Sequence, residues 1–275
     1  MSTIAGNVSD NLRRVIDSNS RLWAGEAEVF RTYWTWDKRT RETDRQWLAY
    51  QCYKEVWSVL TGDPSDGLFM GTLKRIEKMF PKIDDEIDRH TVLDEAEGLW
   101  AEFAHYCAFA DAYDAMGKPG EAKMNPRMIK GRGWKADEEL GRLRHDHRKA
   151  YGEIGEISCK FTEGGYCTLF SEGLKLSANP AGHDGRDGII AEACGKVYDD
   201  EFGHMLKGVI GIDKLGLTAE QWALFEKITV EQLKMRILMR NDQFGKPLSD
   251  KRIREIFAGD IKPIAFDYEQ AKLAA

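Results

Sequence analysis

The sequence predicts an all-α protein built as one bundle of long helices. Apolar residues recur every three or four positions along nearly all of the 275 residues. No segment alternates apolar and polar residues as a strand would, and no Asn-Gly hairpin signal occurs. Clusters of glycine, proline and small polar residues divide the chain into long pieces. Four long helices with shorter additions are therefore expected.

The first half of the chain predicts two long helices with two shorter ones between them. The first helix is expected at about 8–38, and the shorter ones at about 42–61 and 67–79, where the turn-rich segment that begins at Gly62 separates them. The second long helix is expected at about 83–117, because Gly117 and Pro119 form a typical C-terminal stop.

The second half predicts two more long helices and an extension. The long helices are expected at about 136–176 and 186–214, joined by a loop that contains Pro180 and Gly182. Thr218 and Gln221 form a capping box that begins a further helix to about 244, and Ser249 is expected to cap a short last one. We expect one domain over 1–275, with core helices at 8–38, 83–117, 136–176 and 186–214, inserted helices at 42–79 and a C-terminal extension at 218–275.

Composition excludes several classes of protein. Hydrophobic residues make up 42% and charged residues 31%, which is ordinary for a globular protein. The net charge of −6 argues against nucleic acid or an anionic membrane as the main partner. No apolar run reaches transmembrane length and the first residues lack an apolar signal core, so we expect a cytoplasmic protein. The five cysteines include no C-x-x-C pair, which argues against disulfides and a rubredoxin site.

Two Glu-x-x-His motifs are the strongest chemical signal. Glu102 and His105 form the first, and Glu201 and His204 form the second. Residues three apart project from the same face of a helix. Both motifs lie on apolar stripes, the first with Leu99, Tyr106, Phe109 and Tyr113, the second with Cys194, Val197, Met205 and Ile212. A buried carboxylate needs a partner, and a metal ion uses Glu and His together.

The triplet His145-Asp146-His147 has suitable residue types but the wrong spacing for a metal site. Positions i and i+2 do not share a helix face. Basic residues flank the triplet on both sides. We expect a solvated charged patch.

Two further carboxylates would complete a site for two metal ions, and the third core helix offers one of them. Glu163 shares an apolar stripe with Phe170, and it lies about as far before the turn at 178–184 as Glu201 lies after it. If the two helices are antiparallel, Glu163 and Glu201 would lie side by side at the same height along the helix axes. Glu156, two turns earlier on the same face, is the alternative.

The other carboxylate is expected from the first helix. Glu26 has large apolar face-mates, so we prefer it. Glu42 or Asp44 is the fallback if the helix at 42–61 is the true first helix of the bundle. Asp44 and Glu55 lie on a polar stripe that looks solvent-exposed.

The set Glu26, Glu102, His105, Glu163, Glu201 and His204 resembles the ligand set of the ferritin-like diiron carboxylate superfamily. Tyr33 follows Glu26 by seven residues, as in the E-x6-Y of rubrerythrins and bacterioferritins. Asp200 directly precedes Glu201. In bacterial multicomponent monooxygenases and ribonucleotide reductase small subunits an Asp at this place orients the His of the opposite helix. The resemblance thus implies a hydrogen bond from His105 to Asp200. Tyr166 lies one turn from Glu163, and Phe170 replaces the tyrosine of the family pattern.

The resemblance implies a ferritin-like four-helix bundle that binds two Fe²⁺ ions, or a manganese–iron pair, and reacts with O₂. We expect a non-haem diiron oxidase or oxygenase (a monooxygenase, for example) that oxidises a small organic molecule, because the chain is much longer than a minimal bundle. Electrons would come from the substrate or from a separate electron-donor protein, and a homodimer is compatible with the sequence. The alternatives are a rubrerythrin-like peroxidase or ferroxidase, and a metal-free helical interaction protein.

Overall fold

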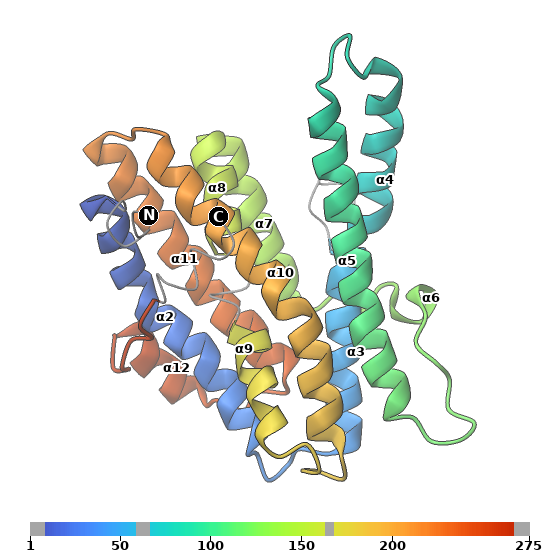
Figure 1. Cartoon of the computed structure of the whole chain (residues 1–275). Coiled ribbons are helices and arrows are strands. Elements are labelled where there is room, and N and C mark those ends of the chain that lie inside the picture. The colour runs from blue at the N-terminus through green and yellow to red at the C-terminus, as the bar shows by residue number, and fades with distance from the viewer. Residues whose placement is uncertain (1–8, 59–66, 163–167, 267–275) are drawn as a thin grey trace.

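A computed structural model describes residues 9–58, 67–162 and 168–266, and it omits the side chains of 199–200, 202–208 and 210–211. All regular structure within these residues is helical (Figure 1). A lone bridge between Ile83 and Ile87 is the only β-type pairing among them. None of the described helices combines the length and the apolar character needed to cross a membrane. The prediction of an all-α protein is therefore confirmed.

The helices are α2 (Asp10–Trp34), α3 (Arg41–Trp57), α4 (Gly67–Met79), α5 (Arg89–Ala115), α6 (Pro126–Ile129), α7 (Lys135–Tyr151), α8 (Glu153–Phe161), α9 (Thr168–Leu174), α10 (Arg186–Lys214), α11 (Ala219–Gln243) and α12 (Asp250–Phe257), with the short 3-10 helices η1 (Phe80–Lys82) and η3 (Lys175–Ala178). Helices α4 and α10 have the predicted bounds. The Thr218 capping box and the Ser249 cap are confirmed, since each side chain accepts a hydrogen bond from the backbone N–H three residues on.

Helix α5 begins at Arg89, six residues after the predicted start. The side chain of Asp88 caps it by accepting a hydrogen bond from the backbone N–H of His90. The preceding residues form a turn in which Asp84 has a φ of 65°. Apolar periodicity continues through this turn, so it did not reveal the cap.

The predicted single helix at 136–176 is wrong. Gly152, with a φ of 55°, ends α7 and turns the chain back, so that α7 and α8 form an antiparallel hairpin. Arg144 on α7 donates from Nη2 to the hydroxyl of Thr162, 3.2 Å away, just after α8. Gly155 permits this close packing, because a Cβ there would overlap the carbonyl of His147.

Three helices bring the motif residues together. Helix α5 packs against α3 on one side and α10 on the other, while α10 also packs against α8 and α9 (Figure 1). Helix α2 packs mainly against α11 and α9. The core between them is rich in aromatic rings, and its largest fully buried side chains include Trp23, Phe30, Trp47, Phe109 and Phe244.

Candidate metal centre

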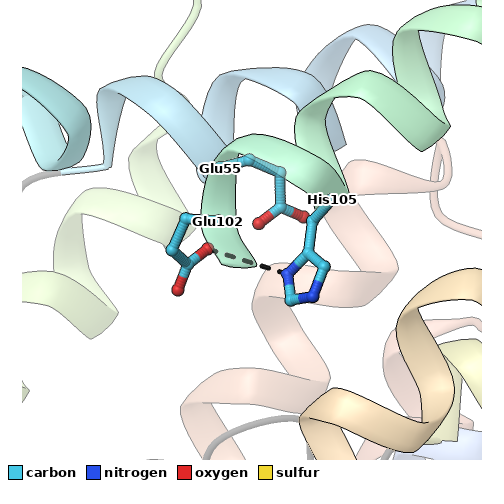
Figure 2. Close-up of side chains that lie close together, drawn as sticks. All are labelled: Glu55, Glu102 and His105. Atoms are coloured by element: carbon cyan, nitrogen blue, oxygen red, sulfur yellow. Dashed lines mark ion pairs between the residues drawn. The ribbon is translucent and has the colours of Figure 1, made fainter. Parts of the chain in front are cut away.

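Three carboxylates converge on the imidazole of His105. Helix α3 contributes Glu55, and α5 contributes Glu102 and His105 from one face (Figure 2). One ligand atom of each of these three residues lies within 4.8 Å of the other two. His105 Nδ1 is 3.9 Å from Glu102 Oε2 and 3.5 Å from Glu201 Oε1, which α10 supplies. We call Glu55, Glu102, His105 and Glu201 the Glu/His cluster.

The Glu/His cluster is buried on most sides. His105 is 3% exposed, Glu55 5% and Glu201 8%, whereas the Glu102 side chain retains 23% of its surface. Two like charges 4 Å apart repel by about 4 kcal/mol at an effective dielectric constant of about 20. A bound divalent cation would turn this repulsion into attraction. Three carboxylates with one imidazole form an oxygen-rich donor set that fits Fe²⁺ or Mn²⁺.

Several predicted site residues cannot be placed. Glu163 and Tyr166 lie outside the described residues, and the side chains of Asp200 and His204 are likewise not described. Of the six predicted ligands, the structure therefore brings together Glu102, His105 and Glu201.

Glu26 is buried as predicted, but its partners are arginines. Its side chain is fully buried. Arg236 on α11 donates to both carboxylate oxygens, at 3.2 Å from Nε and 2.8 Å from Nη2, and Arg240 Nε lies 3.4 Å from Oε1. Glu26 therefore belongs to a buried ion pair and is not part of the Glu/His cluster. Arg236 and Arg240, four residues apart among apolar neighbours, are the sequence signal for this pair.

The fallback Asp44 also has cationic partners. Arg39 and Arg186 lie 3.0 Å and 2.9 Å from its carboxylate oxygens, and all three side chains are largely buried. The predicted companion of Glu26, Tyr33, donates its hydroxyl to Asp44 Oδ1 at 2.9 Å. Burial, reinforced by the negative charge of Asp44, raises the pKa of Tyr33, so its hydroxyl remains protonated. Asp44 and Tyr33 thus join α2 to α3 away from the cluster.

The other two alternatives lie on the surface. Glu42 is exposed and pairs with Arg41 at 2.8 Å. Glu156, half exposed, faces Arg148 on the neighbouring helix of the α7–α8 hairpin at 3.8 Å. The structure brings neither residue to the Glu/His cluster.

Sequence reasoning missed Glu55 because its stripe looked solvent-exposed. The stripe is in fact buried, with Asp44 at 0%, Gln51 at 3% and Glu55 at 5% exposure. Its polar side chains face other polar groups inside the protein. Apolar residues buried on the flanks of the stripe, such as Leu48 and Cys52, were the available sign that this stripe is covered.

The expectation of a solvated charged patch at His145-Asp146-His147 is wrong for His147. His147 is only 7% exposed, because the α7–α8 hairpin packs it against α11. Its Nδ1 lies 3.0 Å from Gln232 Nε2, and its Nε2 lies 3.3 Å from Glu231. Burial lowers the pKa of His147 and outweighs the opposing effect of Glu231.

A cavity of about 90 Å³ adjoins the Glu/His cluster. Its wall combines three cluster carboxylates with four basic side chains, Lys54, Arg144, Arg236 and Arg240. Burial, together with the nearby Arg236 guanidinium, lowers the pKa of Arg240 to about 10. At about 30 Å³ per water molecule, the cavity has room for dioxygen and water.

A larger groove of about 490 Å³ reaches His105 from outside. Trp100 and Phe103 line it with apolar surface, whereas Asp111 and Lys196 line it with charge. Trp100 is 73% exposed, which is unusual for so large an apolar side chain. The volume of the groove is in the range of small-molecule sites, and the groove is open to solvent.

No protein-family model, curated protein or solved structure was found to match this chain. The geometry of the Glu/His cluster is therefore the basis on which a function can be assigned.

Proposed function

We propose that this protein is a non-haem diiron oxidase or oxygenase with a ferritin-like bundle, in which Glu55 replaces Glu26 as the first carboxylate ligand. The observation that carries the proposal is the convergence of Glu55, Glu102 and Glu201 on His105 in a largely buried place. The bundle would consist of α3, α5, α10 and the α8–α9 segment, which agrees with the packing of α10 against α5, α8 and α9. Glu163 and His204 complete the proposed ligand set as sequence predictions.

Each described residue has a task in this proposal. Glu55, Glu102, His105 and Glu201 would hold the iron, and bound ferrous ions supply electrons for the reduction of dioxygen. The 90 Å³ cavity would admit dioxygen beside the carboxylates. Trp100 and Phe103 would hold the apolar part of an organic substrate in the groove that ends at His105.

The groove favours oxidation of an organic molecule over the chemistry of a minimal bundle. Ferroxidases and rubrerythrin-like peroxidases act on Fe²⁺ or peroxide, which need no aromatic-lined groove of about 490 Å³. The helices outside the proposed bundle, α2, α11 and α12, also favour an oxygenase, because a minimal bundle does not need them.

Anaerobic titration with Fe²⁺ tests the metal site. We expect about two irons per chain, as in di-iron bundles. Glu55→Ala should lose iron. Glu28→Ala should not, because Glu28 on α2 pairs with Arg252 of α12 at the protein surface. Fewer than about one iron per chain for the wild type would contradict the proposal and favour a metal-free interaction protein.

Addition of oxygen to the iron-loaded protein distinguishes the enzymes. An oxygenase should consume O₂ faster when its organic substrate is present, so a panel of aromatic and aliphatic molecules is screened by oxygen uptake. Trp100→Ala should weaken this stimulation while iron binding persists. Rapid peroxide turnover without organic product would instead identify the rubrerythrin-like alternative, and accumulation of ferric iron would identify a ferroxidase.

A further inference from the structure

Glu55 is held by a chain of hydrogen bonds that begins at the buried ion pair of Glu26. Gln51, one turn before Glu55 on α3, donates from Nε2 to Glu55 Oε1 at 2.5 Å. Its other amide atom, Oε1, accepts from Arg240 Nη1 at 2.8 Å and from Gln243 Nε2 at 3.0 Å. Arg240 in turn faces Glu26. We call Glu26, Arg240, Gln243 and Gln51 the Gln51 network.

The chemistry of the partners fixes the direction of the Gln51 amide. An arginine side chain has only donors, so the atom of Gln51 that faces Arg240 must be the oxygen. The amide NH₂ then points to Glu55. If the amide were reversed, its NH₂ would face the Arg240 donors and its oxygen would face a carboxylate that accepts. Arg240 therefore determines which end of Gln51 meets Glu55.

Burial keeps the Gln51 network in this arrangement. Glu26 is 0% exposed, and Arg240, Gln243 and Gln51 are 2–3% exposed. Arg236 holds the second side of the Glu26 carboxylate with two hydrogen bonds. Rotation of the Gln51 amide would break its hydrogen bonds to Glu55, Arg240 and Gln243 together.

We propose that Gln51 is a positioning residue that aims the Glu55 carboxylate at the metal, and that Arg240 and Glu26 set its orientation. This inference rests on the proposed metal site. By donating to Oε1, Gln51 fixes the rotation of the Glu55 carboxylate beside Glu102 and His105. Loss of a hydrogen bond that orients a metal ligand typically weakens metal binding by about 10- to 100-fold.

Replacement of Gln51 by leucine tests the proposal. Leucine preserves the approximate volume and removes the donor to Glu55. The control is Asn19→Leu, which removes another buried amide, one that contacts Thr229 and is not part of the network. Affinities for Co²⁺ and Fe²⁺ are measured under anaerobic conditions by competition with a chelator, and visible absorption reports the coordination of Co²⁺. Gln51→Asn, whose shorter amide cannot span Glu55 and Arg240, is a second variant in case leucine prevents folding.

Weaker binding of about 10- to 100-fold in both Gln51 variants, with an altered Co²⁺ spectrum, supports the proposal. Asn19→Leu should bind both ions as the wild type does. Wild-type affinity and an unchanged spectrum in a folded Gln51 variant would overturn the positioning role and leave the metal site intact. Absence of metal binding by the wild type would overturn both the proposed function and this inference.

Discussion

Replacing Glu26 by glutamine should destabilise the protein strongly without removing a metal ligand. Glutamine has nearly the same shape but no charge. The substitution would leave Arg236 and Arg240 buried side by side, at 3% and 2% exposure, without the carboxylate that faces both. Breaking a buried ion pair by removing one partner costs about 3–5 kcal/mol.

This magnitude translates into a large change in melting temperature. With an unfolding entropy of about 2.1 cal/mol/K per residue over 275 residues, the substitution lowers Tm by about 5 to 9 °C. Urea unfolding of the metal-free protein, followed by circular dichroism, measures the free energy of unfolding directly. Iron stoichiometry is measured on the same samples. With iron in excess it should stay at the wild-type value, because Glu26 is not a proposed ligand and Gln51 and Gln243 still accept hydrogen bonds from Arg240.

Glu28→Gln is the matched control on the same helix. Glu28 also binds an arginine through two hydrogen bonds, at 2.6 Å and 2.9 Å from Arg252, but about a quarter of each side chain is exposed. Such a pair contributes about 0–1 kcal/mol, so the control should unfold almost as the wild type does. A Glu26→Gln variant with wild-type stability and fewer bound irons would refute this reasoning and restore Glu26 as a ligand.

Three further predictions concern the cluster, the hairpin and pH. Glu55→Gln should lose most of the rise in Tm that Co²⁺ gives the wild type, because it replaces a charged ligand atom by a neutral one; an equal rise would exclude Glu55 as a ligand. Gly155→Ala should lower the free energy of unfolding by about 1–3 kcal/mol, because the new Cβ overlaps the α7 backbone. Gly98→Ala on α5 is the control: its Cβ would contact no other group, so it should raise the free energy of unfolding by about 0.5–1 kcal/mol. Urea unfolding measures both. The lowered pKa of His147 means that the unfolded chain binds this proton more readily, so the stability contribution is present above about pH 6.5 and is lost as pH falls through the folded-state pKa; unfolding at pH 7.5 and 5.5 should show this loss, with a smaller loss in His147→Gln.

Local signals were sufficient for most helices. The Thr218 capping box and the loop that contains Pro180 and Gly182 indicate the starts of α11 and α10 from a few adjacent residues, and both starts agree with the prediction. The α7–α8 hairpin was missed because apolar periodicity continues across Gly152, and a single glycine within a helical pattern is usually tolerated. The positive φ of Gly152 turns the chain, and the absence of a Cβ at Gly155 lets α8 pack closely on α7.

The sequence predicted those parts of the candidate site that depend only on spacing within one helix. Glu102 and His105 share a helix face because of their spacing, and this holds in any fold that keeps α5 helical. The choice between Glu26 and Glu55 depends on residues about two hundred positions away on α11, and spacing along the chain carries no information about them.

Glu26 and Glu55 also show what an apolar helix face indicates. A carboxylate on such a face is buried, but its partner comes from another helix, as Arg236 and Arg240 do for Glu26. A buried carboxylate can also be oriented from its own helix, where the donor lies one turn away, as Glu55 is by Gln51. The polar neighbours that made Glu55 look exposed are therefore the groups that hold this buried carboxylate. A polar stripe on a helix with apolar flanks therefore indicates buried carboxylates, as Asp44 and Glu55 both show.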